Sequence, residues 1–236
     1  MFKSFAAVCL AGITSAFSVD KFEYMQYVAE HNKNYSTLDE FQMRFELFAE
    51  TNAIIKFWNE SGEMTSTMGH NFLSDYTVQE KANLRGYKGD EKRRNEVATF
   101  DNSPVPNAVN WVTAGKVGPV KDQGQCGSCW AFSATGAVES NIAITYGGAV
   151  PNYSEQQLVS CSSAYGNAGC NGGWYYAAWD YMKVTAQENS SSYPYTSGTT
   201  GVDGTCTANT SLGKVKVTTY AAIGQTNAEI IAAINV

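Results

Sequence analysis

Hydrophobic and polar positions alternate at helical spacing in the first half of the chain. Between Thr37 and Asn59, apolar and aromatic residues recur three or four positions apart, as on one face of an amphipathic helix. The Thr37 hydroxyl can accept a hydrogen bond from a backbone N–H of the first turn, and the carboxylate of Glu40 can reach back. We therefore expect a long helix from Thr37 to about Asn59, and a short helix before it at residues 22–28.

A less polar stretch lies in the middle of the chain. From Trp130 to Ile144, small and large apolar residues follow one another with few breakers until Gly147 and Gly148. This pattern predicts a mostly buried helix that starts at or just before Cys129.

Shorter patterns follow this central stretch. Ser154 and Gln157 repeat the capping-box spacing and predict a short helix that ends near Cys161. Alternation at residues 214–217 predicts a strand that begins a β-rich domain, and residues 228–234 predict one last short helix.

The N-terminal segment and a later linker have their own compositions. Residues 1–18 carry Lys3, an apolar run and then small residues, which is typical of a secretory signal peptide and too short to span a membrane. Residues 86–106 are rich in charge, Gly and Pro, which predicts a linker. Export makes disulfides credible. The acceptor sequences for N-linked glycosylation are Asn34, Asn59, Asn152, Asn189 and Asn209.

Composition narrows the classes of partner. The 236 residues carry a formal net charge of −6, and 44% of them are hydrophobic. A chain of this length can bury a sizeable core, in one or two domains. The negative charge disfavours nucleic acid and anionic membranes as partners and fits a soluble protein. We also expect a monomer, with no membrane association once the signal is removed.

Cysteine count and position suggest thiol chemistry. Cys9 falls in the segment expected to be removed, and the five other cysteines indicate two disulfides and one free thiol. Cys129 is the candidate nucleophile, because the N-terminus of a helix favours the reactive thiolate. Gln123 can donate its amide hydrogen to an oxyanion. The C-x-x-C spacing of Cys126 and Cys129 also occurs in metal and redox sites, but no second pair stands at zinc spacing.

The segment around Cys129 resembles a known family. Residues 123–130 read Q-G-Q-C-G-S-C-W, and C-G-S-C-W is the local signature of papain and the cathepsins. The chain resembles the precursor of a cathepsin L-like cysteine peptidase of the papain family. Further matching residues are Trp111, Cys170-Asn171-Gly172-Gly173 and Tyr193-Pro194-Tyr195. We expect Trp111 to lie in the core.

The polar helical region ahead of the linker resembles the inhibitory prosegment of that family. Thr51 stands where the family has Asn, and Leu73 stands where its G-x-N-x-F-x-D motif has Phe. A helical hairpin with ordinary salt bridges is the alternative interpretation. The matching positions are Glu40, Arg44, Phe48, Ile55, Asn59, Gly69, Asn71 and Asp75.

The resemblance implies an α+β, papain-like fold. The helical left domain would be complete and the β-rich right domain only begun, with the helical prosegment ahead of them and lying along the cleft backwards relative to a substrate. The expected parts are a signal peptide at 1–18, the prosegment at 19–104 and the peptidase domain at 105–236, with activation cleavage near 103–105. The implied disulfides are Cys126–Cys170 and Cys161–Cys206.

The implied activity is endopeptidase action on peptide or protein substrates, without metal or organic cofactor. The Cys129 thiolate would attack a peptide carbonyl to form an acyl-enzyme, while Gln123 and the Cys129 N–H hold the oxyanion. A Gly-Gly edge would pair with the substrate backbone, and two aromatic residues would line the pocket for the side chain before the scissile residue. A tight turn and a core helix are the alternatives for these residues, which are Gly172, Gly173, Trp174 and Tyr175.

A catalytic base is missing from the part that would survive maturation. In the family, His and Asn follow the Cys by ~130–150 residues, whereas here the chain ends at Val236. The only histidines are His31, expected at the surface, and His70, expected to be structural or pH-sensing. We therefore expect a C-terminally truncated and inactive chain with uncovered apolar surface.

A second interpretation belongs to another functional class. The chain would then be an inactive protein whose prosegment inhibits related cysteine peptidases. In either case the prosegment is an intramolecular partner. The expected location is the secretory pathway, leading to a lysosome or vacuole or to the outside of the cell.

Overall fold

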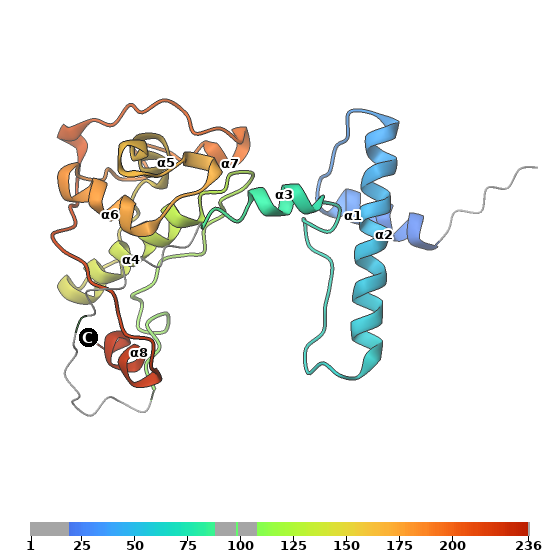
Figure 1. The fold of residues 1–236 in the computed structure, drawn as a ribbon, viewed down its shortest axis with the longest axis horizontal. Helices are drawn as coiled ribbons and strands as arrows, with labels where there is room; N and C mark the ends of the chain where they lie inside the picture. The colour runs from blue at the N-terminus through green and yellow to red at the C-terminus, as the bar shows by residue number, and fades with distance from the viewer. Residues whose placement is uncertain (1–18, 88–97, 99–107, 236) are drawn as a thin grey trace, which may run out of the picture. The chain divides into compact units, whose positions relative to one another are not determined.

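The computed structural model of the chain describes residues 19–87, 98 and 108–235. The predicted signal peptide and the expected cleavage region lie outside these residues. The chain divides into two compact units between Lys81 and Ala82, and Figure 1 labels the helices of both. None of the helices in the described part is long and apolar enough to cross a membrane.

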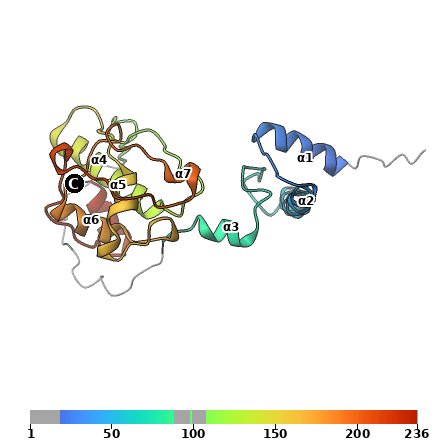
Figure 2. The ribbon, with the colours of Figure 1, turned by 90° about the horizontal axis from the view of Figure 1, so that it is seen from above.

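The first unit is built on two packed helices. Helix α1 (Val19–Glu30) lies against α2 (Leu38–Ser61), which Figure 2 shows end-on. Their apolar faces meet in a small aromatic core of Tyr24, Tyr27 and Phe48, all of them buried. The predicted long helix is confirmed, with a start and an end close to those expected.

The start of α2 differs in one detail from the predicted capping box. The Thr37 hydroxyl accepts from the Glu40 N–H at 3.1 Å, as expected. The Glu40 carboxylate reaches one residue farther back than Thr37, to the N–H of Ser36 at 2.9 Å. Both donors would otherwise lack a partner at the helix start.

The loop that returns along α2 (residues 62–77) is fixed near both of its ends. Asn59 exchanges two hydrogen bonds with the backbone of Met68, at 2.8 and 2.7 Å. Arg44 forms a two-pronged pair with Glu80 at 2.6 and 2.7 Å, near the start of α3 (Val78–Asn83). Thr51, the departure from the family motif, donates to the Ser74 carbonyl at 2.8 Å and so serves the same loop.

Asp75 lies buried in this loop and joins the two helices. It accepts from the Tyr27 hydroxyl at 2.8 Å, from Lys33 at 2.9 Å and from the Tyr35 hydroxyl. Burial by itself would raise the pKa of Asp75, but hydrogen bonds from Tyr35, Lys33 and Tyr27 lower it. The carboxylate is therefore charged, and both of its oxygens accept hydrogen bonds.

The two histidines belong to this unit. His31, expected at the surface, is half-buried, with its ring 4.7 Å from that of Tyr27. His70 stacks on Phe48 at 4.2 Å, and its Nε2 faces the Asn52 amide oxygen at 3.2 Å. Burial lowers the pKa of His70, so the neutral ring is favoured.

The second unit packs around α4 (Cys129–Tyr146), the predicted buried helix. Helices α5 (Glu155–Cys161) and α6 (Tyr175–Val184) lie against it, as Figures 1 and 2 show. Alanines at the contacts let the helices approach closely around larger side chains. The buried core comprises Cys126, Trp130, Ala131, Ala134, Leu158, Val159, Ala178, Tyr181 and Met182.

Short helical segments complete this unit. Helix α8 (Asn227–Ile234) is capped by Thr226, whose hydroxyl accepts from the Glu229 N–H at 3.3 Å, a capping box that our sequence interpretation missed. The others are η1 (Ser163–Tyr165), η2 (Gly169–Asn171), α7 (Ser197–Thr200) and η3 (Thr210–Leu212).

Strand pairing is sparse, and the strand predicted at 214–217 is reduced to one bridge. Lys214 and Val215 pair only with Gln187, within the described part of the chain. A ladder needs a neighbouring strand that continues alongside, and Gln187 alone cannot supply one. Apart from this bridge, the described residues hold Tyr153↔Asn189 and Tyr87↔Gly173.

Two further expectations need correction. Ser154 caps α5 by accepting from the Gln157 N–H at 3.0 Å, but the Gln157 side chain does not return to the cap. It is buried and bonds to Tyr181 and to the backbone of Ala186 and Glu188. Trp111, expected in the core, is half-buried and donates from Nε1 to the Ile234 carbonyl at 2.9 Å.

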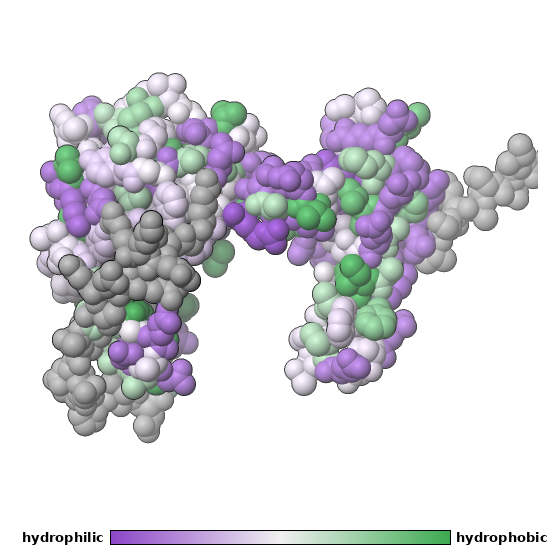
Figure 3. All heavy atoms as spheres, in the orientation of Figure 1, coloured by the Kyte–Doolittle hydropathy of each residue, from purple (hydrophilic) through white to green (hydrophobic). Residues whose placement is uncertain are grey.

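Apolar side chains also reach the surface of both units. Figure 3 shows green, hydrophobic patches among the purple ones on the first unit. In α2, Ile54 and Phe57 are 53% and 65% exposed. In the second unit, Tyr146 at the end of α4 and Val184 at the end of α6 are 82% and 64% exposed.

Candidate active site

Cys129 is the first residue of α4 and its thiol is free and half-buried. The other described cysteines form the disulfides Cys126–Cys170 and Cys161–Cys206, the same pairing that the resemblance implies. At this helix start the Ala131 N–H donates to the Ser128 carbonyl at 2.8 Å, while the N–H groups of Cys129 and Trp130 make no backbone hydrogen bond within the described residues.

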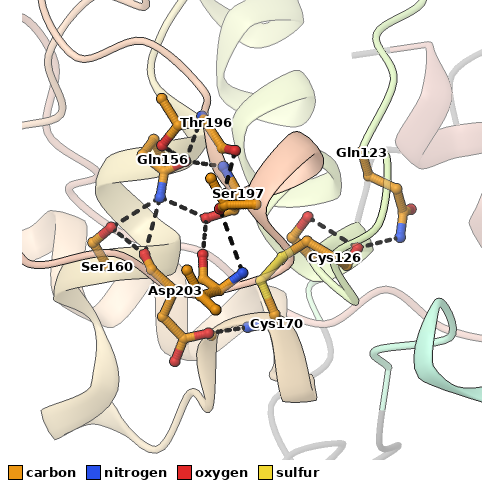
Figure 4. Close-up of a disulfide and its surroundings, with 12 residues drawn as sticks. Gln123, Cys126, Gln156, Ser160, Cys170, Thr196, Ser197 and Asp203 are labelled. Atoms are coloured by element: carbon orange, nitrogen blue, oxygen red, sulfur yellow. Dashed lines mark hydrogen bonds between the residues drawn. A yellow bond between two sulfur atoms is a disulfide. The ribbon is translucent and has the colours of Figure 1, made fainter. Parts of the chain in front are cut away.

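The Cys126–Cys170 disulfide, shown in Figure 4, shapes the backbone beside Cys129. The Gly127 N–H donates to the Cys170 carbonyl at 3.0 Å. A Cβ on Gly127 would lie 2.4 Å from the carbonyl oxygens of both Asn83 and Cys170, so only glycine fits. Two backbone segments therefore approach each other closely next to the thiol.

Gln123 presents its amide to a peptide carbonyl. Its Nε2 donates to the Cys126 carbonyl at 2.8 Å and to the Leu84 carbonyl at 3.0 Å. The first bond fixes the side chain on the turn before Cys129. The second is the kind of contact that an oxyanion-stabilising amide makes with a reacting carbonyl.

The segment after Leu84 lies along the Gly172-Gly173 edge. The Gly173 N–H donates to the Gly86 carbonyl at 2.8 Å, and Tyr87 forms a parallel bridge with Gly173. The ring of Tyr87 stacks on that of Tyr175 at 6.1 Å, with 12° between the planes. This edge thus already binds an extended peptide backbone.

Tyr195 ties the Gln123 turn to the start of α4, a role that our sequence interpretation missed. Its hydroxyl donates to the Gln123 carbonyl at 2.8 Å and lies 2.7 Å from the buried Ser128 hydroxyl. Burial raises the pKa of Tyr195, so the hydroxyl keeps its proton. The distance of 67 residues between the partners explains why no local pattern could indicate this contact.

A polar network supports the disulfide on the Cys170 side. Asp203 accepts from the Cys170 N–H at 2.6 Å. Figure 4 shows Gln156 donating to Ser160, Ser197 and the Asp203 carbonyl at 3.0, 2.8 and 3.0 Å. Gln156 and Ser197 are buried, and such groups need these partners. The network fixes the loop that carries Cys170.

Asn167 places the aromatic residues of the candidate pocket. Its amide oxygen accepts from the Trp174 N–H at 2.8 Å, and its Nδ2 donates to Ser162 at the same distance. Trp174 is half-buried, and Tyr175 is 36% exposed. Both residues stay reachable, although Tyr175 also begins α6.

A buried ion cluster joins α4 to α5. Lys121 bonds to Glu139 at 2.8 Å and to Glu155 at 2.6 Å, and both carboxylates are almost fully buried. Burial raises the pKa of Glu155, against the hydrogen bond from Lys121. Within the described residues, this cluster included, no group of three or more His, Cys, Asp or Glu could hold a metal ion.

Comparison with known proteins places the site in a family. Residues 105–236 match the papain family cysteine protease domain. The chain belongs to the papain family of cysteine proteases. Residues 24–80 match the cathepsin propeptide inhibitor domain (I29), so the first unit carries the inhibitor domain of a cathepsin L-like peptidase precursor.

Relatives agree along most of the chain. It is 39% identical over 196 residues to digestive cysteine proteinase 3 of Homarus americanus, covering 80% of the chain and 60% of that relative. It is also 39% identical over 186 residues to a cathepsin L-like proteinase of Phaedon cochleariae, covering 76% of the chain and 56% of that protein. The chain thus spans less than two thirds of these relatives.

Solved structures share the fold. A digestive procathepsin L 3 of Tenebrio molitor superposes with a TM-score of 0.77 at 32% identity, covering 92% of this chain and 70% of that one. A recombinant stem bromelain precursor gives the same TM-score at 28% identity, covering 92% and 69%. Both are proforms, which supports a papain-like fold with an inhibitory prosegment.

Proposed function

We propose that the second unit carries the nucleophile, the oxyanion donor and the substrate edge of an endopeptidase, kept latent by its own prosegment. The observation that carries this proposal is the Leu84 carbonyl, 3.0 Å from the Gln123 amide. Two residues on, Gly86 pairs with Gly173 at 2.8 Å. A peptide backbone of the chain itself thus occupies the place that a substrate needs.

In this mechanism Cys129 attacks the carbonyl carbon of a peptide bond. The electron pair of that carbonyl moves to its oxygen, which Gln123 and the Cys129 N–H stabilise. The amine leaves with a proton, and water then releases the acyl group from sulfur. A substrate would pair with the Gly172-Gly173 edge, in the direction opposite to the prosegment.

We propose that the base needed for these steps is absent from this chain, because no histidine follows Cys129 in the given residues. His31 and His70 are its only histidines, and neither lies in residues 105–236. In a serine peptidase, loss of the equivalent base costs on the order of 10⁶ in kcat. We therefore propose that this chain does not turn over peptides, although its thiol can still be modified.

The remaining assignments follow from the same proposal. We place the prosegment at 19–104 and the peptidase domain at 105–236, with removal of residues 1–18 on export. Trp174 and Tyr175 would contact the substrate side chain before the scissile residue. The prosegment motif residues Glu40, Arg44, Phe48, Ile55, Asn59, Gly69, Asn71 and Asp75 would hold the inhibitory unit together. We expect delivery to a lysosome-like compartment or outside the cell.

Two readouts test this function. The full chain is treated with a fluorogenic peptide and, separately, with a peptidyl electrophile, and adducts are located by mass spectrometry. We expect labelling at Cys129, slower labelling for Gln123→Ala, none for Cys129→Ser, and no turnover. Measurable turnover that Cys129→Ser abolishes would refute the inactivity. Failure of Cys129 to react even in Gly86→Ala, where a Cβ would lie 1.8 Å from the Gly127 carbonyl oxygen and displace the occupying segment, would refute the site.

A second function rests on the prosegment itself. Residues 24–80 match an inhibitor domain and have their own aromatic core. The chain would then bind the cleft of a related active peptidase. Inhibition of such an enzyme by the Cys129→Ser chain would favour this function, and no inhibition at excess chain would exclude it.

A further inference from the structure

The candidate glycosylation sites differ in what the folded chain does with the acceptor amide. We propose that Asn34 and Asn152 carry N-linked glycans, and that Asn59 cannot carry one in the folded protein. The inference rests on the export proposed above, and it does not depend on peptidase activity.

Asn59 uses the amide hydrogen that a glycan would replace. Its Nδ2 donates to the Met68 carbonyl at 2.8 Å, while its Oδ1 accepts from the Met68 N–H at 2.7 Å. Both bonds go to one residue, so the donated hydrogen is the one on the same side as Oδ1. A trans secondary amide places its N-substituent on that same side. A sugar on Asn59 and the pairing with Met68 therefore exclude each other.

The loss would affect the whole returning loop. Met68 immediately precedes the Gly69 motif, and the next anchors of the loop on α2 are His70 and Ser74. Chains modified at Asn59 would lack the first anchor and would fold less well. The Asn-Glu-Ser sequence at 59–61 thus serves the loop, although it has the form of an acceptor sequence.

Asn34 has the opposite environment. It lies in the loop between α1 and α2 and is exposed, whereas its neighbours Lys33 and Tyr35 both bond to buried Asp75. Its amide makes no hydrogen bond with any other described residue. Ser36, which completes the acceptor sequence, is exposed as well. A glycan at Asn34 therefore displaces no contact.

Asn152 combines a free amide with a buried hydroxyl two residues on. Its carbonyl accepts from the Ser190 N–H at 3.0 Å, but its exposed side chain makes no hydrogen bond among the described residues. The Ser154 hydroxyl donates to the Tyr193 carbonyl at 2.6 Å and caps α5. Because the transferase must reach this hydroxyl, modification at Asn152 takes place before α5 folds.

The chemistry is a glycosyl transfer from a lipid-linked oligosaccharide pyrophosphate. The amide nitrogen of Asn forms a bond to C1 of the first sugar. The bond from C1 to the pyrophosphate oxygen breaks, and the lipid pyrophosphate leaves with the electron pair. The nitrogen loses one proton to a base of the transferase and keeps the other.

The test expresses the full chain through a eukaryotic secretory pathway. The secreted protein is treated with a peptide N-glycosidase in ¹⁸O water, and labelled Asp is located by mass spectrometry. We expect label at positions 34 and 152 and none at position 59. On gels, Asn34→Gln and Asn152→Gln should each remove one glycosidase-sensitive step, while Asn59→Gln should remove none.

Cell-associated protein provides the second measurement, which covers a variant that folds poorly. This protein is first treated briefly with a protease, and the surviving chains are then labelled with the glycosidase in ¹⁸O water. Any chain that carries a glycan at position 59 should be digested faster than chains without one. Label at position 59 in secreted, protease-resistant protein would overturn the proposal. Absence of label at either position 34 or position 152 would overturn it equally, whatever the thiol assays show.

Discussion

The residues closest to Cys129 are held by partners far away in the sequence. The Gln123 amide donates to the Leu84 carbonyl, and the Ser128 hydroxyl is hydrogen-bonded to the Tyr195 hydroxyl. Gly127 has no room for a Cβ. At this scale the geometry of the candidate site depends on a few hydrogen bonds and on one close approach of backbones, and single substitutions can test each of them.

Removal of the Tyr195 hydroxyl is expected to lower the free energy of unfolding measurably. Tyr195→Phe leaves the buried Ser128 hydroxyl and the Gln123 carbonyl without this partner. An unsatisfied buried polar group costs about 1–3 kcal/mol. Chemical denaturation should show a loss of this size, together with slower labelling of Cys129 by a peptidyl electrophile.

Tyr165→Phe is the matched control for this substitution. Tyr165 is 37% exposed and contacts Tyr181 with its ring. Because that ring remains, its stability and labelling rate should stay near those of the parent chain. Equal effects of the two substitutions would mean that the Tyr195 hydroxyl has no special role.

Gly86 is expected to be essential for seating the prosegment backbone. A Cβ at this position would lie 1.8 Å from the Gly127 carbonyl oxygen, which is backbone and cannot move aside. Gly86→Ala should therefore displace the segment and speed the alkylation of Cys129 by a peptidyl electrophile. Gly136→Ala, where a Cβ meets nothing within 4 Å, is the control and should leave the rate unchanged.

At the scale of elements, the α2 hairpin consists of α2, the returning loop and the start of α3. Its stability depends on ionised side chains. Hydrogen bonds from Arg44 lower the pKa of Glu80 to about 2. Its usual value is 4.5, so the unfolded state takes up the proton first as the pH falls. This contribution to stability is complete above about pH 4.5 and is lost towards pH 2.

Hydrogen exchange of the full chain can measure this loss. Peptides from the α2 hairpin should exchange faster as the pH is lowered from 5 to 2.5, after correction for the intrinsic rate. Glu80→Gln should exchange faster at pH 5 and show a smaller further change. Glu46→Gln, on an exposed side chain of the same helix, is the control. An unchanged pH dependence in Glu80→Gln would contradict the assignment.

At the scale of the whole molecule, the two disulfides should differ in function but match in stability. They join residues 44 and 45 positions apart. By loop entropy each should stabilise the fold by ~4 kcal/mol. Only Cys126–Cys170 borders Gly127 and the Gly172-Gly173 edge, so only its loss should disturb the site.

The paired variants make this comparison direct. Replacing Cys126 and Cys170 by Ser should lower the free energy of unfolding about as much as replacing Cys161 and Cys206. Labelling of Cys129 by a peptidyl electrophile, relative to labelling by iodoacetamide, should fall only in the first variant. Equal labelling ratios would show that the first disulfide does not shape the site.

Local patterns were sufficient to predict several parts of this protein. The helix from Leu38 to Ser61 and its cap at Thr37 follow from spacing and hydroxyl chemistry within a few residues. The start of α4 at Cys129 follows from an apolar run bounded by glycines. These features depend on neighbours along the chain, so the sequence by itself determined them.

Other features depended on contacts that no local pattern contains. The alternation at 214–217 resembles a strand, but Val215 finds only Gln187 beside it. Gln157 has the spacing of a capping residue, yet its side chain is buried and donates to the Tyr181 hydroxyl instead. The seating of Leu84 on Gln123 and of Tyr195 on Ser128 joins residues 39 and 67 positions apart. Only the tertiary structure could decide these, because such hydrogen bonds form between groups that packing, not chain proximity, brings together.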